Sequence, residues 1–147
     1  MKFSKCILLL FPALCGCSLE QEKTQNEINN IVIPADHSYD EVSDFELTWD
    51  SVFDVENERY YVYFYSLTCS HCSEIKNYII EKGLERGDIY FVKGTSKDRL
   101  TNDQKELIGA EIPEDFRILG YPTLALIYHK KCTKNLSGVT QIKAELK

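Results

Sequence analysis

The sequence contains no apolar run long enough to cross a membrane, no cluster of basic residues and no internal repeat. Its N-terminal apolar run, Cys6 to Phe11, is far shorter than the roughly 20 residues that a transmembrane helix needs. The chain carries 23 acidic and 17 basic side chains, a formal charge of −6, without the basic stripe that nucleic-acid binding requires. We therefore expect neither a transmembrane helix nor a nucleic-acid partner.

The chain is also too short for two hydrophobic cores. Its 147 residues, of which 44% are hydrophobic, suffice for one core of modest size. We therefore expect one folded domain, over residues 41–147, preceded by segments of a different kind.

The N-terminal residues have the pattern of an export signal. Two lysines precede the apolar run, as in a secretory signal peptide. The sequence Leu-Cys-Gly-Cys at 14–17 then resembles a bacterial lipobox, in which cleavage precedes a cysteine that receives lipid. On this interpretation residues 1–16 are a lipoprotein signal peptide, Cys17 is lipidated, and residues 17–40 tether the domain to the extracytoplasmic side of the bacterial cell membrane. An ordinary signal peptide with an incidental Cys17 is the alternative.

Charge would not hold the processed chain at a membrane. Loss of residues 1–16 removes two lysines and no acid, so the formal charge changes from −6 to −8. An anionic membrane surface repels such a chain, which leaves lipid as the anchor. Fully extended, residues 18–35 reach about 60 Å at most, enough for the domain to meet secreted or surface proteins.

The rest of the chain is organised around residues 60–83. Tyr60 to Tyr65 is an almost wholly apolar run, which predicts a central strand covered on both faces. Cys69-Ser70-His71-Cys72 follows. Cys72, Ile75 and Ile79 then have the spacing of one helical face, and Gly83 is a natural helix stop.

The spacing of the two cysteines favours disulfide exchange. In the first helical turn, the Cys69 sulfur lies near free backbone N–H groups and the positive end of the helix dipole, which stabilise a thiolate. A protonated His71 would add to this effect. Cys72, one turn further on, is placed to attack a mixed disulfide at Cys69 and release the partner.

The combination of strand, Cys-Ser-His-Cys and helix resembles the active-site segment of the thioredoxin superfamily. Gly120-Tyr121-Pro122-Thr123 similarly resembles the loop of that family in which a cis proline faces the cysteine pair. The likeness covers residues 45–146 and implies an α/β, thioredoxin-like fold, with a central mixed β-sheet flanked by helices on both faces. The chain is also similar to small bacterial surface lipoproteins described as bacteriocin transport accessory proteins.

The resemblance implies a thiol-disulfide oxidoreductase. Cys69 would be the attacking thiol and Cys72 the resolving thiol, with no cofactor other than their redox-active disulfide. Pro122 would be the cis proline, and Ser70, His71 and Tyr121 would modulate the site or bind substrate. Partners would be cysteine-containing secreted or surface proteins, and a redox partner that resets the disulfide.

Two positions distinguish this sequence within the resemblance. Ser70-His71 is closer to the Pro-His pair of oxidising bacterial relatives than to ordinary thioredoxins, which favours an oxidant. Many members also carry a buried carboxylate six residues before the first cysteine, where Tyr63 stands here. Proton transfer to and from Cys72 must therefore use water or another group.

Weaker patterns predict the remaining elements. We expect a folded part that begins near Phe45, strands at 89–92 and 123–128, and a last strand near Leu136. We also expect helices at 49–55, from 101 to 108, from 113 to 119, and at 141–146.

Two other functions remain open at this point. Cys69 and Cys72 could bind zinc if His129 and Cys132 completed a tetrahedral site. Alternatively, the cysteine pair is structural and the chain is a non-catalytic binding lipoprotein. Outside these alternatives, Cys132 is expected to be a lone thiol in a hairpin.

Overall fold

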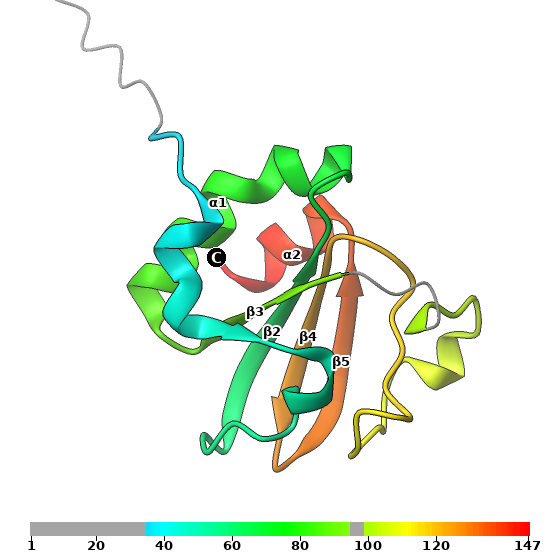
Figure 1. Cartoon of the computed structure of the whole chain (residues 1–147). Helices are drawn as coiled ribbons and strands as arrows, with labels where there is room; N and C mark the ends of the chain where they lie inside the picture. The colour runs from blue at the N-terminus through cyan, green and yellow to red at the C-terminus, as the bar shows by residue number, and fades with distance from the viewer. Residues whose placement is uncertain (1–34, 95–98) are drawn as a thin grey trace, which may run out of the picture. The chain divides into compact units, whose positions relative to one another are not determined.

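A mixed five-stranded sheet forms the centre of the protein (Figure 1). The computed structural model describes residues 35–94 and 99–147, so the signal peptide, Cys17 and residues 17–34 of the tether lie outside the described residues. The strand order is β1-β3-β2-β4-β5, with β1 and β2 parallel to β3, and β4 antiparallel to β2 and β5. This is the thioredoxin-like α/β fold that the sequence predicted. The strands are β1 (Glu46–Leu47), β2 (Arg59–Tyr65), β3 (Ile89–Lys93), β4 (Thr123–Tyr128) and β5 (Lys131–Ser137).

Strand β2 is buried on both of its faces, as predicted. Tyr61, Tyr63 and Tyr65 belong to one hydrophobic cluster, and Tyr60, Val62 and Phe64 belong to another. The alternation follows from the two-residue period of a strand. The central strand therefore contributes to two cores of one domain, one on each face of the sheet, where the sequence analysis expected a single core.

The first core lies under three helical elements, which are η1 (Tyr39–Phe45), α1 (Ser70–Arg86) and α2 (Val139–Glu145). Helix α1 places Cys72, Ile75 and Ile79 in this core, the face that the sequence predicted. The predicted stop at Gly83 was wrong, because α1 continues to Arg86 and ends at Gly87, whose φ of 68° is left-handed. Gly83 instead allows close packing, since a Cβ there would lie 2.8 Å from Phe91 Cζ.

The second core is covered by short 3-10 helices and loops, with no α-helix in the described residues, so the helices predicted at 49–55, from 101 to 108 and from 113 to 119 were wrong. The 49–55 segment forms only the short 3-10 helix η2 (Trp49–Ser51), and the 99–119 segment only η4 (Gln104–Glu106). Aromatic packing accounts for this difference. The ring centroids of Trp49 and Phe116 lie 4.7 and 5.2 Å from that of Phe64. The buried side chains Phe116 and Ile118 are two residues apart, a spacing that one face of a helix does not give.

The ordered part begins before Phe45, which the sequence had predicted as its start. Ser38 and Glu41 form a capping box at the start of η1, and Tyr39 and Val42 pack into the first core. His37 fastens this element to α1, because its imidazole lies 2.9 Å from Glu41 and 3.4 Å from Glu81.

The C-terminal part contains a tight hairpin. Strand β5 begins at Lys131, earlier than predicted, directly after a turn in which His129 and Lys130 have φ of 47° and 61°.

None of the helices in residues 35–94 and 99–147 is long and apolar enough to span a membrane.

Candidate redox site

The start of α1 holds the Cys69 sulfur. Cys69 is the N-cap residue, with extended backbone, and its Sγ accepts a hydrogen bond from the Cys72 N–H at 3.2 Å. This N–H is one of the donors that the first turn of a helix leaves without a backbone partner. Cys69 thus lies at the helix start, as the sequence predicted, and the residue is only partly buried.

The loop before β4 supplies the other neighbour of Cys69. The Cys69 thiol donates a hydrogen bond of 3.3 Å to the carbonyl oxygen of Tyr121. The Tyr121–Pro122 bond is cis, as the resemblance implied. Thr123 holds the loop in place, because its hydroxyl donates to the Gly120 carbonyl at 2.7 Å. The structure therefore brings together two motifs that are separated by about fifty residues in the sequence.

Cys72 has a different environment from Cys69. Its side chain faces the first core and is only 2% exposed. Burial, followed by the neighbouring Cys69 sulfur, raises the pKa of the Cys72 thiol to about 12. The pair thus consists of one accessible sulfur at a helix start and one buried, protonated sulfur behind it.

Ser70 and His71 occupy the exposed first turn of α1. The His71 side chain is 72% exposed, and its Nδ1 lies 3.6 Å from a carboxylate oxygen of Glu74. The ring is therefore paired with Glu74, and the stabilisation of the Cys69 thiolate by a protonated His71 stays a prediction.

Gly94, which directly follows β3, is a site residue that the sequence analysis did not identify. A Cβ at this position would lie 2.1 Å from both Cζ and Oη of Tyr121, so the Tyr121 ring packs directly over the glycine. The Gly94 N–H also donates to the Tyr65 carbonyl at 2.7 Å. A glycine at the end of a strand was the only sequence signal, and it did not identify the partner.

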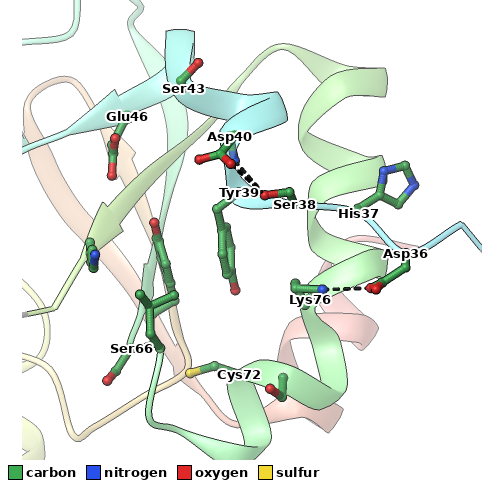
Figure 2. Close-up of a pocket in the computed structure, with 14 residues that line it drawn as sticks. Asp36, His37, Ser38, Tyr39, Asp40, Ser43, Glu46, Ser66, Cys72 and Lys76 are labelled. Atoms are coloured by element: carbon green, nitrogen blue, oxygen red, sulfur yellow. Dashed lines mark hydrogen bonds and ion pairs between the residues drawn. The ribbon is translucent and has the colours of Figure 1, made fainter.

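A cavity of about 580 Å³ reaches the site from the side of η1 (Figure 2). Its walls include Tyr39 from η1, Tyr65 and Ser66 from the end of β2, and Cys72 and Lys76 from α1. Lys76 pairs with Asp36 at 2.8 Å at the mouth of this cavity. Tyr39 was missed by the sequence analysis because it lies in a polar stretch with no periodic pattern.

The four residues considered as a zinc site are not brought together. Cys132 lies on β5 in the second core, on the face of the sheet opposite the core that contains Cys72. Its Sγ donates to the Leu107 carbonyl at 3.3 Å, and burial raises the pKa of this thiol to about 12. Within the described residues, no group of three metal-ligating side chains is present. Cys132 is thus a free thiol in the β4–β5 hairpin, as the sequence predicted, and it is buried in the second core.

Comparisons with known proteins give similar folds among solved structures. No protein-family model matches the chain, and no curated protein matches it. Thioredoxin f2 of Chlamydomonas reinhardtii is 22% identical, with 69% of this chain and 89% of that chain covered and a TM-score of 0.45. Plasmodium falciparum thioredoxin is 19% identical, with 69% of this chain and 94% of that chain covered and a TM-score of 0.47. A chain from a study of yeast mitochondrial 1-Cys peroxiredoxin and the glutathione/thioredoxin systems is 20% identical, with 74% of this chain and 94% of that chain covered and a TM-score of 0.48.

Proposed function

We propose that this protein is an extracytoplasmic, lipid-anchored thiol-disulfide oxidoreductase that acts on cysteine-containing secreted or surface proteins. The observation that carries the proposal is the setting of the Cys69 sulfur. It lies between the Cys72 N–H and the Tyr121 carbonyl, while Cys72 is buried one helical turn behind it. An accessible attacking sulfur and a covered resolving sulfur are what two-step disulfide exchange requires.

The exchange proceeds in two steps. The Cys69 thiolate attacks one sulfur of a substrate disulfide, which forms a mixed disulfide and releases the other substrate sulfur as a thiolate that takes up a proton. Cys72 then loses its proton and attacks the Cys69 sulfur, which releases the second substrate thiol. The substrate is reduced by two electrons and the Cys69–Cys72 pair is oxidised by two. The reverse sequence oxidises a substrate dithiol, and a separate redox partner resets the pair.

The loop at Tyr121 is the proposed docking position for the substrate. Its carbonyl contacts Cys69, so an extended substrate segment that lies along Tyr121 brings its own sulfur to the attacking thiol. Leu67 and Leu119 lie in the two loops that carry Cys69 and Tyr121, and their side chains are 63% and 40% exposed. These exposed apolar groups suit contact with an unfolded or extended polypeptide.

Trapping of partners tests the exchange function. Cys69→Ala should abolish exchange, whereas Cys72→Ala should accumulate mixed disulfides with natural partners, visible by non-reducing electrophoresis and mass spectrometry. Cys132→Ala is the matched control and should neither trap partners nor stop exchange, because this thiol is buried in the second core. Undiminished exchange by the Cys69 variant would overturn the mechanism.

The lipid anchor needs a separate test. Cys17→Ser should move the full-length protein from the membrane fraction to the medium or soluble extracytoplasmic fraction, with loss of lipid from its N-terminal peptide by mass spectrometry. Membrane attachment that survives this substitution would contradict the lipidation proposal and leave the exchange chemistry unaffected.

A further inference from the structure

Two buried hydroxyl groups beside Cys72 have no hydrogen-bond partner in the described residues. They belong to Tyr39 of η1 and Tyr63 of β2, and both tyrosines pack into the core that contains Cys72. A buried hydroxyl without a partner is unfavourable, because it has lost its hydrogen bonds to water and gained none in return. Two such groups next to a thiol that must lose its proton therefore call for an explanation beyond packing.

The rings of both tyrosines are held firmly in position. Tyr39 stacks on Tyr65 at 3.8 Å between ring centroids, and Tyr63 lies nearly parallel to the same ring at 6.1 Å. Phe91 meets Tyr39 and Tyr63 edge-on at 6.3 and 5.9 Å. The hydroxyl oxygens are thereby fixed, and their protons can only rotate about the C–O bonds.

The two hydroxyls and Cys72 influence one another electrostatically. Burial first, then Tyr39 and Cys72, raises the pKa of Tyr63 far above its usual value, and burial raises the pKa of Tyr39 as well. Burial raises the pKa of the Cys72 thiol, and the nearby Tyr63 hydroxyl acts in the opposite direction. Neither phenol ionises near neutral pH. Each can nevertheless accept a proton on its oxygen while it releases its own.

The cavity beside η1 provides the end point for a proton. Tyr39 and Cys72 both line it, together with polar side chains such as Ser66, Ser73 and Lys76 that can hold water. Figure 2 shows Tyr39 extending from η1 toward Cys72 across this space. Tyr63 lies on β2, is fully buried and belongs to the same hydrophobic core as Cys72.

We propose that Tyr63 and Tyr39 relay the proton of Cys72 to water in this cavity during the resolving step. The Cys72 proton passes to the Tyr63 oxygen as the Tyr63 proton passes to Tyr39, whose own proton passes to water. The Cys72 thiolate then forms a bond to the Cys69 sulfur, and the partner sulfur leaves with the bonding electron pair. This inference rests on the proposed exchange function, since it concerns the second step of that reaction.

Stopped-flow reaction of the reduced full-length protein with an aromatic disulfide that yields a coloured thiolate separates the two steps. The first phase reports attack by Cys69, and the second reports release of the second thiolate when Cys72 resolves the mixed disulfide. Tyr63→Phe and Tyr39→Phe should leave the first phase unchanged and slow the second about 10- to 100-fold. The double variant should be no slower than Tyr63→Phe, because both groups act in one relay, and the solvent deuterium isotope effect on the second phase should change.

Tyr61→Phe is the matched control. Tyr61 lies on the same strand and face as Tyr63, but its hydroxyl donates to Glu145 at 2.9 Å and is not part of the relay. Both phases should stay at the rate of the unaltered protein. Should Tyr63→Phe fail to fold, Tyr39→Phe decides alone. An unchanged second phase in the tyrosine variants would overturn the relay while exchange stands, whereas the absence of a second phase in the unaltered protein would overturn the proposed function itself.

Discussion

The contact between Gly94 and Tyr121 shows how a single hydrogen atom in place of a methyl group can position the redox site. In Gly94→Ala the new Cβ would meet the Tyr121 ring at 2.1 Å, so the ring must move. We expect a loss of about 1–3 kcal/mol in the free energy of unfolding and slower attack by Cys69, because Tyr121 also provides the carbonyl that contacts its sulfur.

Gly120→Ala is the control for this prediction, since a Cβ at Gly120 would meet no atom within 4 Å. Urea denaturation and the first phase of disulfide exchange measure the two effects. Equal behaviour of the two alanine variants would contradict the assigned role of Gly94.

Burial of Cys132 predicts a pH dependence of stability. Folding raises its pKa to about 12, so at alkaline pH the thiol stays protonated in the folded protein and ionises in the unfolded chain. Its contribution is therefore complete below the unfolded pKa of about 8.5 and falls as the pH rises above that value, by roughly 1–2 kcal/mol near pH 10.

Urea denaturation of reduced protein at neutral and alkaline pH checks this prediction. Cys132→Ala should be less stable at neutral pH because it leaves a cavity, but its stability should decline less steeply above about pH 8.5. Parallel curves for the two proteins would show that Cys132 does not titrate differently on folding. The remaining decline in the variant is expected from Cys72, whose pKa is also raised to about 12.

At the scale of elements, the distance between α1 and β3 is set by Gly83 and Phe91. In Gly83→Ala a Cβ would lie 2.8 Å from Phe91 Cζ, so we expect about 1–3 kcal/mol of destabilisation, partly offset by up to about 1 kcal/mol of helix propensity. A double-mutant cycle with Phe91→Leu measures the contact, because the smaller side chain should relieve part of the clash. Additive effects of the two substitutions would contradict this account.

The β4–β5 hairpin uses two residues in a conformation that costs about 1–2 kcal/mol for a residue other than glycine. Lys130 gains a compensation, because its Nζ donates to the Phe53 and Val55 carbonyls at 2.8 and 2.6 Å. His129 forms an exposed pair with Glu58, a kind of contact that contributes little, and its ring lies 4.1 Å from the neighbouring Tyr128 ring.

We therefore expect Lys130→Gly to be less stable than His129→Gly by about 1–3 kcal/mol. Thermal unfolding of the two variants, which differ only in the position of the glycine in one turn, measures the difference. Equal stability would mean that the lysine does not hold the 49–55 segment.

The predictability of an element depended on whether its own sequence decided its structure. Tyr60 to Tyr65 and the Cys72, Ile75, Ile79 pattern were predicted correctly because a strand or helix buried on a sheet shows its period locally. The 99–119 segment was predicted wrongly because Phe116 and Ile118 are placed by partners on other elements. Gly83 looked like a helix stop, and only the nearby Phe91 ring explains why a glycine is there.

At the scale of the whole molecule, the sequence indicated the two halves of the candidate site but not what surrounds them. The sequence pattern predicted Cys69 at the start of a helix, and the resemblance implied a cis bond at Pro122. Both features are observed, and the contact from Cys69 to Tyr121 follows from the fold. Tyr39 and the cavity beside η1 gave no sequence signal, and Gly94 gave only that of a strand end, because each acquires its role from residues distant in the chain. These roles depend on packing between residues distant in the chain, which a local sequence pattern does not show.

The reduction potential of the Cys69–Cys72 pair depends on how stable the reduced protein is relative to the oxidised protein. The reduced form holds the hydrogen bond from the Cys69 thiol to Tyr121, which a disulfide removes. Such a bond contributes about 0.5–1.5 kcal/mol, equivalent to about 10–30 mV in favour of the reduced form for a two-electron couple. Glutathione titration of the full-length protein, read by alkylation and intact mass, should give a potential between about −120 and −270 mV, the range of pairs that exchange disulfides. A potential below about −300 mV would mark the pair as a structural disulfide and the protein as a binding module.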